Sequence, residues 1–346
     1  MSEQSQADVD RRIEDFLAAN VAIPNTARVA ASKSQNRLRE ILANKSTTDA
    51  TFPHLLSRVD EDFLGGSFAR HTKIWPLDDI DIYFPIDGAG LFYVENGGRQ
   101  PFSLLTDNPL RPQRLLNAEW LRGQYIGSDL VLSGFLKAVA QAYPNSKLRG
   151  DQHAVCLGTT VAATSASVGI GFDIVPCFCL APDGGGTNIY LIPDGSGSWL
   201  RTNPRIDTVV CKNLHDYHNK TFRKVVRLVK YWNANRFNGR FTSYFIELAI
   251  GQCSLEHMRL GKSMCCITEA LAWAFYALKQ ASDKGSLNPF VEGCPVVNAP
   301  QLTLREGSLL ATVPTLSNDA WNSVIAENVD LAIACLKRIF GDGFGA

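Results

Sequence analysis

Three aspartates stand inside a stretch that otherwise favours a β-strand. Residues 78–84 read Asp-Asp-Ile-Asp-Ile-Tyr-Phe, and strands are normally depleted in aspartate. Alternate residues of a strand share a face, so Asp79 and Asp81 should project together while Ile80 and Ile82 enter the core. Two neighbouring carboxylates repel each other unless a cation lies between them, and Mg²⁺ prefers such oxygen ligands together with substrate phosphates. The pair therefore predicts a metal site directed at a phosphorylated substrate.

A glycine-containing turn precedes these acids. Residues 65–67 are Gly-Gly-Ser, and glycine lets backbone amides approach an anion while a serine hydroxyl can donate to a phosphate oxygen. Residues 68–74 are expected to open a helix, whose N-terminus favours negative charge. We therefore predict that Gly66 and Ser67 bind phosphates beside the metal held by the aspartates.

A third acid lies about ninety residues further along the chain. Asp173 is the one charged residue in the apolar segment 168–178, and a lone buried carboxylate should be paired or bound to a metal. Asp79, Asp81 and Asp173 would together hold two metal ions, which can activate an attacking hydroxyl and stabilise a leaving pyrophosphate. The alternative is that residues 78–81 form a turn and Asp173 is a satisfied core acid.

Residues 222–247 contain a basic helical face. Arg223, Arg227 and Lys230 follow each other at the spacing of one helix face. One interpretation is a solvated charged face. The other is that Lys230 reaches a triphosphate as a point charge.

The combination of these motifs resembles the DNA polymerase β-type nucleotidyltransferase superfamily. Within it, Lys230 with the following Ser243 and Tyr244 resembles the group of oligoadenylate synthetase, cyclic GMP-AMP synthase and the bacterial CD-NTases. In that group the lysine and the serine-tyrosine pair contact the triphosphate and the donor base, although Tyr244, beside Phe245, could equally be a core residue. The motif blocks GSFARHTKI and LDDIDIYF resemble the SMODS-type CD-NTases, with the D clade favoured. His71 departs from the small residue of many relatives.

The resemblance implies a function. The chain is expected to join nucleoside triphosphates, ATP among them, into a cyclic di- or trinucleotide second messenger of CBASS anti-phage defence, using two Mg²⁺ ions or Mn²⁺. It also implies a downstream effector that binds the product, and an E1/E2-like ligase that conjugates the chain through Ala346, the end of the glycine-rich tail. A linear oligoadenylate synthetase, another template-independent nucleotidyltransferase, and a non-enzymatic nucleotide-binding regulator remain the alternatives.

The elements that must position these residues suggest an α/β (α+β) architecture of two lobes. A polymerase β-like catalytic lobe with a mixed sheet and N-terminal spine helices is expected over residues 1–205, and a helical lobe with a flexible tail over 206–346. Apolar periodicity predicts these helices and strands, and a loop-rich stretch over 85–112. The predicted helices are 7–20, 26–43, 128–143, 216–234, 242–257, 263–281 and 318–340. The predicted strands are 79–85, 153–160, 168–178 and 188–192.

Composition narrows the partners. The 346 residues include 34 Lys+Arg against 34 Asp+Glu, so the chain offers no overall charge that would attract duplex nucleic acid. No apolar run approaches the roughly 18 residues of a membrane span, and the odd number of cysteines without a CxxC pair is typical of reduced thiols. We expect a cytoplasmic protein with no membrane partner.

Overall fold

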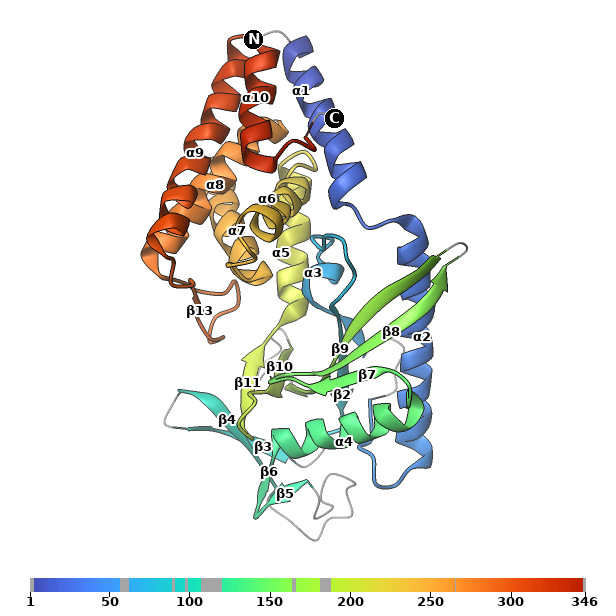
Figure 1. Cartoon of the computed structure of the whole chain (residues 1–346). Helices are drawn as coiled ribbons and strands as arrows, with labels where there is room; N and C mark the ends of the chain where they lie inside the picture. Colours follow the sequence, from blue (N-terminus) through green and yellow to red (C-terminus); the bar gives the residue numbers. More distant parts are fainter. Residues whose placement is uncertain are drawn as a thin grey trace.

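The computed structural model describes residues 3–56, 62–88, 91–96, 99–106, 120–163, 166–180, 188–264 and 266–344. Two lobes lie one above the other and are joined along one side by the N-terminal helices (Figure 1). The N-terminal half contributes α1 Glu3–Phe16, η1 Leu17–Val21, α2 Asn25–Thr48, β1 Phe63–Leu64, α3 Gly66–Ala69, β2 Ile80–Ile86, β3 Leu91–Asn96, β4 Arg99–Thr106, β5 Leu121–Arg122, β6 Tyr125–Ile126, α4 Ser128–Ala142, β7 Lys147–Gly150, β8 Val155–Ala163 and β9 Ala166–Leu180. The C-terminal half contributes β10 Ile189–Pro193, β11 Trp199–Thr202, α5 Pro204–Tyr217, α6 Phe222–Arg236, α7 Ser243–Arg259, α8 Ile267–Lys284, β12 Ser286–Leu287, β13 Val297–Asn298, α9 Leu304–Ile325 and α10 Val329–Phe340.

The lower lobe in Figure 1 is built on one mixed sheet. Its strands run in the order β1-β2-β9-β10-β11-β4-β6-β5, and the β7–β8 pair extends from β9. β2 and β9 pair in parallel, whereas the neighbouring pairs are antiparallel. Apolar side chains of α2 and α4 share one buried cluster with the sheet, including Leu38, Phe135, Ile82 and Ile174. The predicted α/β class with a mixed sheet is confirmed.

The helical lobe has its own core, to which α1 belongs. Val9, Ile13 and Phe16 of α1 are buried among α6, α8 and α10, while α2 packs on the sheet. The helical segment that joins α1 to α2 is a π-helix, followed by Pro24 at the start of α2. The two spine helices therefore bridge the lobes, with the break between them at the junction (Figure 1).

Several element boundaries differ from those predicted. β2 continues through Pro85, and β3 and β4 form a hairpin inside 85–112, where we expected a loop; residues 107–112 lie outside the described part. The predicted helix over 216–234 is two helices, because Asn219 and Lys220 adopt positive φ between α5 and α6. The predicted helix over 318–340 is also two, since Glu327 has a φ of 59°.

The glycine-rich tail turns back on the helical lobe. Phe344 is fully buried, with its ring 5.1 Å from that of Phe16 and 5.8 Å from that of Phe340. Ala346, the predicted conjugation site, lies outside the described residues. Among the helices of the described chain, none is both long and apolar enough to cross a membrane.

Candidate active site

The three predicted acids lie close together on the neighbouring strands β2 and β9. Asp81 in β2 is the register partner of Asp173 in β9, so both side chains lie on the same face of the sheet. Asp79 stands two residues earlier on that face, just before β2 begins. Ile80 and Ile82 point the other way and are fully buried. Alternation along β2 and the pairing of β2 with β9 thus bring together residues 92 positions apart (173 − 81).

Repulsion and burial make this cluster electrostatically unfavourable as three bare carboxylates. Burial, and then the nearby charges of Asp173 and Asp79, raises the pKa of the Asp81 carboxyl to about 7. Burial also raises the pKa of Asp173 and of Asp79. A bound cation would remove this cost, since it favours the ionised form of each acid.

Lys73 provides part of that positive charge. Its ammonium group forms ion pairs with Asp78 and Asp79. Among the described residues, no three His, Cys, Asp or Glu side chains converge into a ready-made metal site. The donor chemistry still fits a divalent cation, because the acids offer carboxylate oxygens on one face of the sheet.

The glycine turn lies directly against the acids. Gly66 has a φ of +58°, and a Cβ placed on it would lie 1.6 Å from Oδ2 of Asp81. The backbone N–H of Gly65 donates to the Asp81 carbonyl at 3.0 Å, so the turn is fixed to β2. The helix expected over 68–74 is the single turn of α3, which begins at Gly66 and holds the buried Ser67. Glycine is required here both for its conformation and for its lack of a side chain.

We expect Gly66→Ala to lower the rate of nucleotidyl transfer about a hundredfold, because an added Cβ must displace the Asp81 carboxylate and small displacements of catalytic groups have effects of this size. The rate of pyrophosphate release measures this. Gly123→Ala is the matched control, since Gly123 has a φ of +66° with nothing within 4 Å of its added Cβ. An equal loss of rate in both variants would mean that backbone strain alone is responsible.

Two clefts open on either side of Asp79. The first, of about 650 Å³, runs between the lobes and is lined by Gly66, Ser67 and Asp81 on one wall and by Ser243 and Tyr244 on the other. The second, of about 600 Å³, is lined by Asp173, Lys147, Arg149 and Cys156 as well as Asp79. The acids therefore stand at the boundary between two spaces, each with the volume of a small-molecule site.

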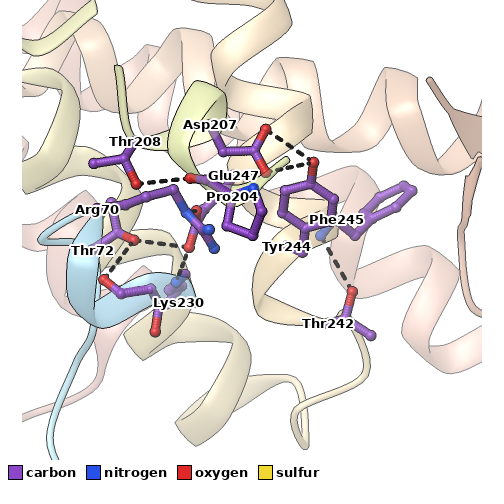
Figure 2. Close-up of polar contacts among 11 residues, drawn as sticks. Arg70, Thr72, Pro204, Asp207, Thr208, Lys230, Thr242, Tyr244, Phe245 and Glu247 are labelled. Atoms are coloured by element: carbon purple, nitrogen blue, oxygen red, sulfur yellow. Dashed lines mark hydrogen bonds and ion pairs between the residues drawn. The ribbon is translucent and has the colours of Figure 1, made fainter. Parts of the chain in front are cut away.

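On the helical lobe, α7 contributes Ser243 and Tyr244 to the lining of the first cleft, and Figure 2 shows Tyr244 beside Asp207. Ser243 is exposed at the first position of α7, and Thr242 caps the helix by accepting from the Phe245 amide at 3.2 Å. The Tyr244 hydroxyl lies 3.1 Å from a carboxylate oxygen of Asp207 in α5. The Arg70 guanidinium lies 5.5 Å from the centre of the Tyr244 ring. Tyr244 is thus a cleft residue with a polar anchor, and its half-buried ring also packs against the apolar core of the helical lobe.

A buried ionic network stands behind the first cleft (Figure 2). Glu247, with a side chain 1% exposed, forms ion pairs with Arg70 and Lys230 and accepts from the Thr72 hydroxyl at 2.8 Å. Burial lowers the pKa of the Lys230 ammonium, and Glu247 opposes that shift only in part. Lys230 is 3% exposed and lines neither cleft. Its predicted contact with a triphosphate therefore stays a prediction that requires the side chain to leave Glu247.

Sequence analysis missed the partners in this network. Arg70, Asp207 and Glu247 are all buried, and none of them was among the residues predicted for the site. Glu247 did carry a signal, because it stands alone in the apolar run 245–250, as Asp173 does in its own strand. His215 lies in the last turn of α5 and His218 is the C-cap of that helix: His215 accepts from the Arg223 amide, and the buried His218 accepts from that of Met264.

Comparison with known proteins finds relatives that match this chain over almost its whole length. No protein-family model matches the chain. A probable cyclic nucleotide synthase of Bacillus cereus (strain VD146) is 27% identical over 344 residues, covering 96% of each protein. Among solved structures, Escherichia coli MS115-1 CdnC in complex with HORMA-deltaN has a TM-score of 0.60 at 20% identity, over 97% of this chain and 98% of that one. The same CdnC with ATP has a TM-score of 0.58 at 20% identity, over 97% and 99%.

The fold is therefore that of a bilobed nucleotidyltransferase. The resemblance to the bacterial CD-NTases that the sequence predicted is confirmed, and it extends over almost the whole chain. The narrower prediction of the D clade stays a prediction. The solved structures share 20% identity with this chain, so they establish its fold and not its clade.

Proposed function

We propose that this chain is a cyclic oligonucleotide synthase that joins nucleoside triphosphates into a cyclic di- or trinucleotide with release of pyrophosphate. The prediction of a nucleotidyltransferase of this class agrees with the B. cereus relative and with the CdnC structures. The observation that carries the proposal is the position of Asp79, Asp81 and Asp173, which lie together between a cleft lined by the Gly66–Ser67 turn and a second cleft beside Asp173.

Nucleotidyltransferases of this kind use divalent metal ions. We propose that Asp79, Asp81 and Asp173 hold two Mg²⁺ ions, for which Mn²⁺ can substitute. When bound, the ions neutralise charge on the triphosphate and lower the pKa of an attacking hydroxyl. The unfavourable burial of the three acids supports this assignment, since a cation is the group that would relieve it.

The remaining roles follow from where the side chains lie. Gly66 and Ser67 line the first cleft beside Asp81, and the glycine backbone and the serine hydroxyl would hold the donor triphosphate there. Tyr244 presents its ring to the same cleft and would stack on the donor base, with Ser243 at the phosphates. Asp173 faces the second cleft, where Lys147 and Arg149 would attract the acceptor nucleotide. Catalysis in this arrangement rests on positioning and charge neutralisation.

The partners are proposed on the same basis. CdnC has been solved with ATP and with a HORMA protein, which supports ATP as a substrate and a regulatory protein as a partner of this chain. We further propose a role in anti-phage defence, with an effector that binds the cyclic product and an E1/E2-like ligase that conjugates Ala346.

The test is to incubate the purified chain with all four nucleoside triphosphates and Mg²⁺, treat the mixture with phosphatase, and analyse it by mass spectrometry. We expect a phosphatase-resistant product with the mass of two or three cyclised nucleoside monophosphates, absent from an Asp79→Asn/Asp81→Asn variant. A ladder of phosphatase-sensitive products would contradict cyclisation and favour a linear synthetase. Metal-dependent nucleotide binding without pyrophosphate release would favour a non-enzymatic regulator.

A further inference from the structure

A row of side chains crosses four neighbouring strands beneath the second cleft. Arg149 of β7 pairs in register with Cys156 of β8, which in turn pairs with Asp173 of β9. Asp173 is the register partner of Asp81 in β2. Register partners lie side by side on one face of a sheet, so the row runs from a cation at the edge strand β7 to the two acids of the predicted metal site. Arg149, Cys156 and Asp173 all line the cleft.

A second row beside the first contains a lysine and two glycines. Lys147 of β7 pairs in register with Gly158 of β8, and Gly158 pairs with Gly171 of β9. Lys147 stands two residues before Arg149, so both cationic side chains lie on the same face of β7, and both line the cleft. The cleft therefore has cations at its β7 edge and acids at its opposite edge. Between Lys147 and β9, its floor is bare backbone.

The fold explains one of these glycines but not the other. A Cβ on Gly171 would lie 1.9 Å from the Asp78 carbonyl oxygen, so the close approach of the chain requires glycine there. A Cβ on Gly158 would meet the Lys147 Cβ at 3.6 Å and the Lys147 carbonyl oxygen at 3.7 Å, which are ordinary contacts. Gly158 is exposed and lines the cleft. A glycine inside a strand often marks a place where a ligand approaches the backbone closely.

The two cations of β7 are available to a ligand. Among the described residues, the ion pairs of β7 are limited to that of Arg149 with Asp151, in which the two charged groups are 3.6 Å apart. Both side chains of this pair are largely exposed, and such pairs contribute little to stability, so the Arg149 guanidinium can turn to an anion. The planar guanidinium matches phosphate oxygens in a bidentate way, and the Lys147 ammonium adds a point charge beside it.

The spacing of the strands sets the length of the ligand that fits between cations and acids. Neighbouring strands lie about 4.8 Å apart, so the Cα atoms of Arg149 and Asp173 are separated by about 10 Å. A nucleotide whose ribose hydroxyl lies at Asp173 would therefore have its own 5′ phosphates within reach of the long Lys147 and Arg149 side chains. The volume of the cleft, about 600 Å³, is that of a small-molecule site.

We propose that the acceptor nucleotide lies across this floor, with its ribose hydroxyl at Asp173 and its 5′-triphosphate at Lys147 and Arg149, so that the site selects acceptors that carry a 5′-triphosphate. This inference rests on the proposed function. In the reaction the acceptor oxygen bonds to the α-phosphorus of the donor, the bond from that phosphorus to pyrophosphate breaks, and the hydroxyl proton passes to solvent. Lys147 and Arg149 take no part in these bond changes, so they determine which acceptor binds.

The test separates donor from acceptor. Saturating 2′,3′-dideoxynucleoside triphosphates of all four bases serve as donors, because they lack the hydroxyls of an acceptor. The acceptors are α,β-methylene nucleoside triphosphates, which cannot donate, each compared with its own nucleoside. Reactions contain Mg²⁺ at low ionic strength, since salt screens exposed charges, and joined products are quantified by mass spectrometry. We expect the native chain to have a KM at least about tenfold lower for the triphosphate acceptor, the effect of one charge-assisted hydrogen bond.

Lys147→Gln/Arg149→Gln should lose this preference through KM, with little change in kcat, because neither side chain touches the reacting atoms. Arg259→Gln is the matched control, since the Arg259 and Arg149 side chains are both 74% exposed and Arg259 lines neither cleft. Gly158→Val tests the floor without a change of charge. It should raise KM for the triphosphate and the nucleoside alike, without lowering the unfolding temperature, because valine favours strands.

Three results would overturn this inference while the proposed function stands, because joining would still occur. These are equal use of triphosphate and nucleoside acceptors by the native chain, a native preference in Lys147→Gln/Arg149→Gln, and a native KM for acceptors in Gly158→Val. The absence of joining with every acceptor would contradict the proposed function itself, and this inference with it.

Discussion

Asp81→Asn should unfold at a higher temperature than the native chain in metal-free buffer, and should lose about a thousandfold or more in the rate of nucleotidyl transfer. The stability gain is expected because Asp81 is buried beside two other acids, and an amide of the same shape removes the repulsion. The rate loss is expected because charge stabilisation by carboxylate-bound metal is a large contribution to phosphoryl-type transfer. Thermal unfolding and pyrophosphate release measure the two effects.

The opposite signs of these two effects distinguish an active-site acid from a structural one. In the native chain Mg²⁺ should raise the unfolding temperature, and in Asp81→Asn this rise should be smaller. Asp283→Asn provides a matched control, because Asp283 is exposed on α8 and pairs only with Lys279 at the surface. A destabilised Asp81→Asn that keeps most of its activity would show that Asp81 is a structural acid and not a metal ligand.

The acid cluster could be predicted from the sequence because strand alternation is a short-range rule. The alternation of Asp79 and Asp81 with apolar residues predicts that both acids lie on one face of β2. Asp173 could be identified because it is the single charged residue in an apolar strand. The pairing of β2 with β9 is long-range and leaves no local pattern in the sequence. The proximity of Asp173 to Asp79 and Asp81 could still be predicted, because a shared metal site would stabilise the acids of both strands.

The Glu247 network could not be predicted in the same way. Its members come from the turn after α3, from α6 and from α7, and Arg70 and Glu247 are 177 residues apart. A basic residue on a helix face has the same local pattern whether it meets solvent, phosphate or a buried acid. The helix boundaries near Asn219, Lys220 and Glu327 were missed for a related reason, since non-glycine residues with positive φ leave little trace in apolar periodicity.

Glu247→Gln should be among the most destabilising single substitutions in the chain, with a loss of about 3–5 kcal/mol in the free energy of unfolding. Glu247 is the shared counter-charge of Arg70 and Lys230, and all three side chains are nearly excluded from solvent. Removing its charge leaves two buried cations without a partner. Chemical denaturation measures the loss, and Glu256→Gln is the control, because Glu256 lies on the exposed side of the same helix.

The double variant Glu247→Gln/Lys230→Met separates charge imbalance from lost packing. Methionine fills much of the volume of the lysine without its charge, so we expect the double variant to recover part of the stability lost in Glu247→Gln. If Lys230→Met lowers the stability of Glu247→Gln by as much as it lowers that of the native chain, the two residues are energetically independent. That result would contradict the ion pair between them.

The network also predicts how stability depends on pH. Burial tends to raise the pKa of the Glu247 carboxyl, but Arg70 and Lys230 outweigh it and lower the pKa to about 2, from its usual 4.5. A lowered pKa means that the unfolded chain binds the proton first, so the stability contributed by Glu247 is complete above pH 4.5 and is lost as the pH falls toward 2. The difference in unfolding free energy between the native chain and Glu247→Gln should therefore shrink over that range. A difference that stays constant from neutral pH to pH 2 would mean that the substitution acts through packing and not through the charge on Glu247.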